Sequence, residues 1–248
     1  MLETELITRV ELSTPVNQCQ GFCWDSKRKQ FILATISSDN KTQDIYRISY
    51  DGSTLSNHRF NDKPRLGHMN TLTYRRDTDI IYTTNATVDG FLLTALDAQD
   101  FSIRQEIKMP YKVFNVAYDP YTHKFVSIRP YKKNIRLIQE YKCVANDNKP
   151  QFVREYELDC VNEDINNNGA FVFLDNIVFT TLTHLVIYDT FNNVKTMVEL
   201  PKNFEVEDID IVDGQLYCSV YRPKGIVEIH RILGLDSQLI KNVRPIGF

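Results

Sequence analysis

The chain has 248 residues and a formal net charge of −3, from 29 basic and 32 acidic residues. This balance excludes the basic patch that a protein binding duplex nucleic acid needs, and it gives no polybasic membrane signal. No apolar stretch approaches the ~18 residues of a membrane helix, and the amino-terminal residues 1–15 lack the apolar core of a signal peptide. We therefore expect no nucleic acid, no membrane insertion, and a cytoplasmic or virion-associated location.

Apolar and polar residues alternate in short runs that end at Asn, Asp, Gly or Pro, which is typical of strands and turns. In chain order, a unit made of a strand, a polar turn and a second strand recurs at residues 21–35, 71–85, 115–129, 169–181 and 206–220. Third strands are predicted at 44–51, 91–98, 134–141, 184–191 and 225–232, and outer strands at 54–60, 101–109, 151–158 and 193–200. The sequence is therefore a repeat of four strands.

The repeats follow one another at intervals close to the ~40–50 residues of a four-stranded propeller blade. The fifth repeat lacks an outer strand of its own, whereas residues 6–12 (LITRVEL) resemble the other outer strands. We therefore predict an all-β fold: a five-bladed β-propeller with four-stranded blades, a single domain over residues 1–248, whose ring is closed by the amino-terminal strand joining the last blade. A β-sandwich or another number of blades is the alternative.

The loops that lead into the inner strands of a propeller gather at one mouth of its central channel, where ligands commonly bind. Here these loops are rich in Asn, Gln, Asp and Glu. Aligning the first apolar positions of the inner strands places one residue of each repeat at the same level, and we call this set the mouth ring: Gln20, Asn70, Phe114, Gly169 and Glu207. Its amide and carboxyl groups suit the hydroxyls of sugars or polyols, because they offer both donors and acceptors.

The segment RLGHMN (65–70) places His68 and Asn70 directly before an inner strand. Two interpretations of this pair remain open. The residues could contact a ligand at the mouth, or they could form hydrogen bonds that join neighbouring blades, since buried polar groups need partners. We predict five ligand-binding residues in all: Gln20, His68, Asn70, Asn168 and Glu207.

Asn168 belongs to the loop NEDINNNG (162–169), which also carries Glu163 and Asp164. Oxygen ligands of this kind suit Ca²⁺, but the spacing is not that of a known calcium loop, and Asn-rich loops are most often turns. The five cysteines stand at irregular spacings without a CxxC pair, so we expect free thiols. We predict no metal and no cofactor.

A glycosidase needs two opposed carboxyl groups roughly 5–10 Å apart. Asp25 and Asp119 stand at the far ends of inner strands, beside turns, and the other inner-strand acids, Glu207, Asp208 and Asp210, come from one repeat. The sequence contains no GxSxG and no phosphate-binding glycine loop. We therefore predict no catalytic residue, and a glycosidase-like enzyme remains only as an alternative.

The run GHMNTLTYRRDTDIIYTT (67–84) resembles a GH-x-N inner strand followed by a second strand with D/N-x-Tyr, and QGFCWDSKRKQFIL (20–33) resembles the opening blade of the same type. These patterns are similar to the propeller domain of receptor-binding tail proteins from phages of Gram-positive hosts, and to helveticin-J-like proteins. The resemblance covers roughly residues 6–240. It implies non-enzymatic binding of a cell-surface glycan or glycopolymer such as wall teichoic acid. Unlike a full receptor-binding protein, the sequence holds no stem or tower segment.

A protein-interaction scaffold is the second hypothesis for the function. In that case the faces of the disc bind a protein partner, and the channel is filled by packed side chains and binds no ligand. Exposed apolar residues clustered on one rim would favour the scaffold, whereas polar residues gathered at the channel mouth favour the polysaccharide.

Overall fold

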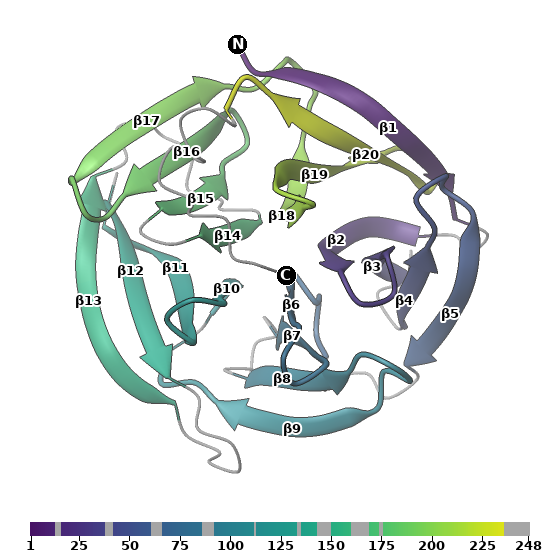
Figure 1. Cartoon of the computed structure of the whole chain (residues 1–248), viewed down its shortest axis with the longest axis horizontal. Coiled ribbons are helices and arrows are strands. Elements are labelled where there is room, and N and C mark those ends of the chain that lie inside the picture. Colours follow the sequence, from purple (N-terminus) through teal and green to yellow (C-terminus); the bar gives the residue numbers. More distant parts are fainter. Residues whose placement is uncertain are drawn as a thin grey trace.

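The structure is a computed structural model, and it describes residues 1–12, 16–37, 42–60, 66–85, 92–111, 113–132, 135–142, 150–159, 169–173 and 176–235. In this part of the chain the regular elements are twenty strands in five antiparallel sheets of four, arranged around a common axis (Figure 1). Among the described residues, no element is a helix able to span a membrane. The all-β, five-bladed propeller is therefore confirmed.

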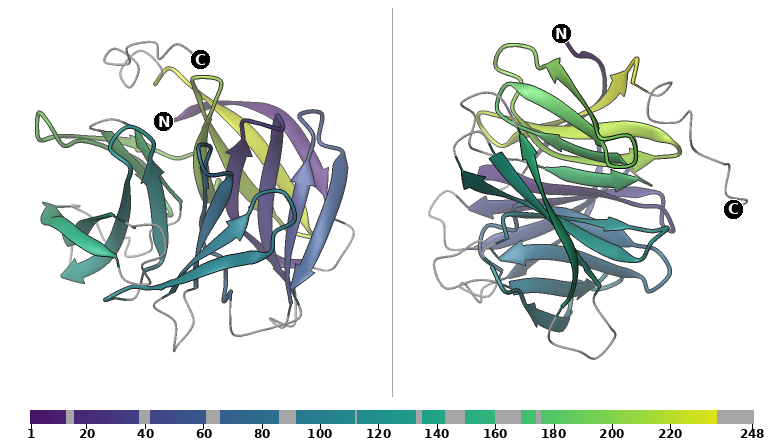
Figure 2. Two further views of the ribbon diagram at one scale, coloured as in Figure 1. Left: turned by 60° about the horizontal axis from the view of Figure 1, so that its bottom comes forward. Right: turned by 90° about the vertical axis from the view of Figure 1, so that its left-hand side faces the viewer.

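Each blade runs from an inner strand near the axis to an outer strand at the rim, as the side views in Figure 2 also show. The strands of blade 1 are β2 (Val16–Asp25), β3 (Gln30–Ser37), β4 (Gln43–Ile48) and β5 (Thr54–Phe60), and those of blade 2 are β6 (Leu72–Arg75), β7 (Ile80–Asn85), β8 (Leu92–Asp97) and β9 (Ile103–Lys108). The strands of blade 3 are β10 (Asn115–Asp119), β11 (Lys124–Lys132), β12 (Ile135–Lys142) and β13 (Gln151–Asp159), and those of blade 4 are β14 (Ala170–Phe173), β15 (Asn176–Thr180), β16 (His184–Asp189) and β17 (Val194–Glu199). Blade 5 contains β18 (Val206–Val212), β19 (Gln215–Arg222), β20 (Ile226–Leu233) and β1 (Glu3–Glu11).

The amino-terminal strand closes the ring, as the sequence predicted. β1 pairs antiparallel with β20, in a register that runs from Glu3 opposite Leu233 to Glu11 opposite Ile226. The strand therefore supplies the outer edge of a blade whose other strands lie at the opposite end of the sequence. This pairing closes the ring without a covalent bond, and it leaves no free end of the ring at which other chains could aggregate.

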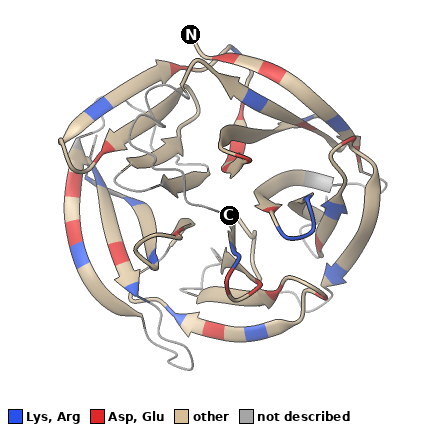
Figure 3. Ribbon diagram, in the orientation of Figure 1, with Lys and Arg blue, Asp and Glu red and all other residues tan. Residues whose placement is uncertain are grey.

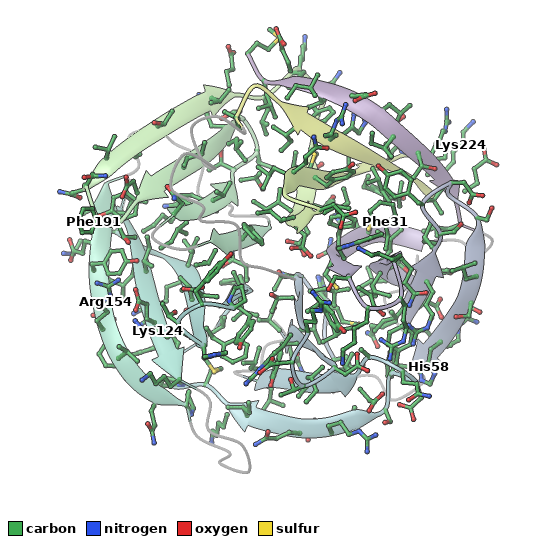
Figure 4. The ribbon with its side chains drawn as sticks, in the orientation of Figure 1. Phe31, His58, Lys124, Arg154, Phe191 and Lys224 are labelled. Carbon is green, nitrogen blue, oxygen red and sulfur yellow. The ribbon has the colours of Figure 1, made fainter. Side chains whose placement is uncertain are left out.

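The hydrophobic core is divided into five clusters, one in each seam between neighbouring blades. In the seam between blades 5 and 1, the rings of Trp24 and Phe31 lie 4.9 Å apart, and Phe31 is fully buried (Figure 4). Trp24 is 5% exposed, so it is a core residue rather than a surface for stacking on sugars. The alternation of the strands produces these clusters, because successive side chains point to opposite faces of each blade.

The turns between first and second strands contain the predicted turn acids. Asp25 accepts hydrogen bonds from the backbone N–H groups of Lys27 and Arg28, each at 3.1 Å. The Arg28 guanidinium donates to Asp25 at 2.9 Å and to both oxygens of Asp79 at 2.9 and 2.7 Å. Figure 3 shows the basic β2–β3 turn beside the acidic β6–β7 turn. We call this face of the disc the turn face; it lies opposite the ends at which the inner strands begin.

The outer strands carry charges of both signs along the rim (Figure 3). One residue of the basic cluster YKKNIR (131–136) differs from the solvated turn that the sequence indicated. Arg136 is only 1% exposed, because it lies inside β12, between the strands β11 and β13. Three of the cysteines, Cys19, Cys23 and Cys218, are free and buried as expected, and the other two lie outside the described residues.

Candidate functional site

The pairing of the inner strands β2 and β18 with their neighbours is irregular. In β2 the pairing with β3 shifts between Cys19 and Gly21, which leaves Gln20 as the extra residue of a β-bulge. In β18 the pairing with β19 shifts between Val206 and Asp208, which leaves Glu207 as the extra residue. A bulge changes the direction of a side chain, and bulges are frequent beside functional sites. Two of the five predicted ligand-binding residues therefore occupy bulges on adjacent blades.

Asp208 is the central polar residue of this region, and it is not among the five predicted ligand-binding residues. The side chain is fully buried, and its Oδ2 accepts hydrogen bonds from the backbone N–H groups of Phe22 and Leu72, both at 2.9 Å. The N–H of Ile209 donates to Oδ1 at 3.0 Å. Asp208 of blade 5 thus binds the inner strands of blades 1 and 2 directly.

Thr71 extends this connection to a fourth blade. Its hydroxyl lies 3.2 Å from Asp208 Oδ2 and 3.3 Å from the carbonyl oxygen of Val116 in blade 3. Blade 4 approaches through Gly169, whose N–H donates to the carbonyl of Glu207 at 2.7 Å. A Cβ at Gly169 would lie 2.2 Å from Asp208 Cα, so only glycine fits there. All five blades therefore meet around the start of β18.

Asp210 repeats the arrangement one step deeper along β18. Its Oδ2 accepts a hydrogen bond from the Trp24 N–H and its Oδ1 one from the Ile211 N–H, both at 2.7 Å. Burial raises the pKa of Asp210 to about 7 and that of Asp208 well above its usual value, although the N–H donors oppose the shift in both cases. These two carboxyl groups are already occupied by backbone donors, so they serve the assembly of the ring and not a ligand.

The structure brings Gln20, Asn70 and Glu207 of the mouth ring to this same place. A Cβ at Gly21 would lie 2.9 Å from the carbonyl oxygen of Met69, which places the start of β2 against the segment before β6. Gln20 is 9% exposed, and its Nε2 donates to Gln18 Oε1 at 3.0 Å. The Oδ1 of Asn70 is buried and has no hydrogen-bond partner among the described residues.

Glu207 is 6% exposed, yet its carboxyl group has no hydrogen bond to any residue that the structure describes. Burial raises the pKa of Glu207 to about 9, and the nearby charges of Glu205 and Asp208 add to the shift. The group is therefore a neutral carboxylic acid at neutral pH, with one O–H to donate and a carbonyl oxygen to accept. The Glu207 oxygens are not among the fully buried side-chain atoms that lack a hydrogen bond, so the carboxyl group stays accessible from the solvent.

The other candidate residues are placed differently. His68 is exposed, next to Gly67 and Met69, which have φ angles of +57° and +52°. No described residue forms a hydrogen bond with its ring, so the alternative in which His68 joins two blades finds no support there. Asn168, Glu163 and Asp164 lie outside the described residues.

Within the described inner strands, the acids near the strand starts all belong to β18, whereas Asp25 and Asp119 bind turn residues at the opposite ends. In the described part of the chain no group of three or more His, Cys, Asp or Glu side chains is placed to hold a metal ion.

A second polar feature lies between blades 3 and 4, on the turn face. A cleft of about 50 Å³ is lined there by residues that include Lys124, Glu140, Arg154 and Tyr156. Glu140 is 4% exposed and accepts hydrogen bonds from Lys124 Nζ at 2.8 Å and Arg154 Nε at 2.7 Å (Figure 4). Because its charges are paired with one another, this cleft offers less unused hydrogen-bonding capacity than the mouth ring.

The fold and this site define the chain as a five-bladed propeller with unpartnered polar groups where its inner strands begin. No protein-family model matches the chain, and a search of curated proteins finds no match. The relation to phage receptor-binding propellers therefore rests on the sequence patterns alone and stays a proposal.

Proposed function

We propose that this chain is a non-enzymatic binding protein for a cell-surface glycan or glycopolymer, of the teichoic-acid type, and that the ligand binds at the mouth ring. The observation that carries the proposal is the pair of β-bulges that hold Gln20 and Glu207 outside the regular strand pairing on neighbouring blades, with the Glu207 carboxyl free of hydrogen bonds to the described residues. Polar groups held on rigid strands without protein partners are suited to bind the hydroxyls of a ligand.

Two further points support a polysaccharide. Phe114 of the mouth ring is partly exposed, and sugar rings bind well where an apolar surface accompanies polar groups. The sequence also resembles the propellers of phage receptor-binding proteins in the segments 20–33 and 67–84. A virion-associated role in a Gram-positive host follows from that resemblance as part of the proposal.

The test is a sedimentation assay of the purified chain with Gram-positive cell walls, before and after removal of wall teichoic acid. We expect the wild-type chain to bind intact walls, and His68→Ala combined with Asn70→Ala to reduce binding at least tenfold. A matched control replaces another His and Asn pair: Asn57 and His58 are exposed on β5 at the rim (Figure 4). Asn57→Ala combined with His58→Ala should bind like the wild type. A wild-type chain that fails to sediment with intact walls contradicts the proposal.

The protein-interaction scaffold remains as a second candidate because of exposed apolar residues on the rim of blades 3 and 4. Phe152, Phe191 and Val194 are 55%, 80% and 54% exposed, and all three lie toward the turn face, at the start of β13 or around the β16–β17 turn. Exposed apolar groups gathered on one rim favour contact with a protein. If the walls are not bound, this rim is the surface to test next, with Phe191→Ser.

A further inference from the structure

Glu207 carries an inference about which part of a polymer the mouth ring contacts, and this inference rests on the proposed function. As the extra residue of the β18 bulge, Glu207 has no partner in β19, and its carbonyl oxygen accepts the N–H of Gly169 instead. The backbone is therefore fixed from blade 4, while the carboxyl group remains without a hydrogen bond to the described residues. The fold therefore fixes the position of Glu207 but gives its carboxyl group no hydrogen bond from the described residues.

The groups facing Glu207 are acidic or neutral. Glu205 in the preceding loop and Asp208 on β18 contribute negative charge. The Cys19 thiol on β2 is also close: burial raises the pKa of Cys19, and the charge of Glu207 adds to that rise. Among the described residues, Glu207 has no ion pair with a Lys, Arg or His side chain. Binding of phosphate or carboxylate requires cations or several convergent N–H donors, and the N–H groups of Phe22 and Leu72 are already bound to Asp208.

We propose that Glu207 selects an uncharged glycosyl unit of the polymer and excludes its phosphate groups. The protonated carboxyl donates its O–H to one ligand hydroxyl and accepts a hydrogen bond from another. A hydroxyl satisfies such a site because it both donates and accepts, whereas a phosphate oxygen only accepts and brings charge beside Glu205. In a glycosylated teichoic acid the recognised part is then the glycosyl substituent.

The experiment measures binding by isothermal titration with two probes: a purified poly(glycerol phosphate) teichoic acid carrying glycosyl substituents, and the same polymer after enzymatic removal of these substituents. We expect the wild-type chain to bind the glycosylated polymer at least tenfold more tightly, with no competition from inorganic phosphate at millimolar concentration. Equal binding of both polymers, or displacement by phosphate, overturns the inference while leaving the proposed function in place. A chain that binds neither polymer and no intact wall overturns both.

Two variants separate the role of the carboxyl from its effect on folding. Glu207→Gln keeps a neutral donor and acceptor, so its affinity for the glycosylated polymer should stay within about threefold of wild type at pH 7. At pH 10 the wild-type carboxyl is ionised and should lose at least tenfold in affinity, whereas Glu207→Gln should not. Glu207→Ala should bind at least tenfold more weakly at both pH values, with its folding checked by circular dichroism. If Glu207→Gln loses affinity with pH as the wild type does, another group controls binding.

Discussion

Replacing Asp208 with Ala tests whether the buried carboxyl of β18 holds the blades together. The substitution removes the acceptor for the N–H groups of Phe22 and Leu72, on blades 1 and 2, and for the N–H of Ile209. A buried donor left without a partner costs about 1–3 kcal/mol. For the two inter-blade donors alone, the expected loss in free energy of unfolding is about 2–6 kcal/mol. Single domains are stable by only about 5–15 kcal/mol, so a large fraction of the variant can be unfolded.

Asp208→Asn gives a graded comparison. The Asn carbonyl can occupy the position of Oδ2 and retain both inter-blade hydrogen bonds, so that only the donor of Ile209 faces an amide NH₂. The expected loss is then about 1–3 kcal/mol, smaller than for Ala. Urea unfolding followed by the fluorescence of Trp24 measures both variants, because this single tryptophan is buried in the seam between blades 5 and 1.

Asp213→Asn is the control on the same blade, because the Asp213 side chain is 70% exposed and pairs with an exposed lysine, and Asn tolerates the φ of +47° at this position. It should change the free energy of unfolding by no more than about 1 kcal/mol. The reasoning is refuted if Asp208→Ala costs less than about 1 kcal/mol, because burial of the carboxyl would then outweigh the bonds that it makes. If Asp208→Asn is as unstable as Asp208→Ala, the negative charge of the Asp208 carboxylate holds the blades together, and not the position of its acceptor oxygen.

Three further predictions concern ring closure, the turn face and pH. Val10 in β1 is 1% exposed, so Val10→Ala should lower the free energy of unfolding by about 2 kcal/mol, measured with urea or heat. Arg9→Ala, on the exposed face of the same strand, should lower it by no more than about 0.5 kcal/mol. Equal effects of the two variants would contradict closure by β1. Arg28→Met leaves Asp25 without its cation and Asp79 with Lys27 alone at 3.8 Å, and should cost about 1–3 kcal/mol. Lys29→Ala, whose ion pair is exposed, should cost about 0–1 kcal/mol. The pKa of Glu207 is raised from 4.5 to about 9 on folding, so its contribution to stability is fully present below about pH 4.5 and is lost as the pH rises through about 9. Relative to Glu207→Gln, the wild-type free energy of unfolding should therefore fall by up to about 1.4 kcal/mol per pH unit midway between these two pKa values. Parallel pH profiles would show that the carboxyl is not held protonated.

The fold could be predicted from the sequence because each strand carries its own alternation and the four-strand period repeats. The placement of β1 in blade 5 followed from the likeness of residues 6–12 to the other outer strands, and the pairing from Glu3 to Glu11 with β20 confirms it. The turn roles of Asp25 and Asp119 also followed from their positions just after an alternating strand. These features depend on short segments and their neighbours in the chain.

The role of Asp208 depends on distant contacts, so no local pattern reports it. Its partners Phe22 and Leu72 are 186 and 136 residues away in the sequence. A signal was nevertheless present: Asp208 and Asp210 are two apart in an inner strand, so they share one face; Asp208 is fully buried and Asp210 half-buried. Acids on this face require donors, and the aligned Gly169 marks the place where a neighbouring blade comes close.

The bulges at Gln20 and Glu207 could not be predicted either, because an extra residue in one strand is defined by its register with the next. Aligning the inner strands placed both residues in the mouth ring, and the structure adds that each lies outside the regular pairing. For His68 the sequence offered two roles, and its exposed ring makes no hydrogen bond among the described residues. The binding role of the five candidate residues stays a prediction.

Hydrogen–deuterium exchange of the chain with and without glycosylated wall teichoic acid tests the central claim most directly, because it reports where a ligand binds without any substitution. A ligand at the mouth ring should slow exchange in the segments that begin the inner strands, residues 18–22, 66–72 and 205–209, and leave the β16–β17 turn unchanged. Protection confined to the turn face, or to the rim around Phe191, would contradict the account and place the binding surface on the other side of the propeller.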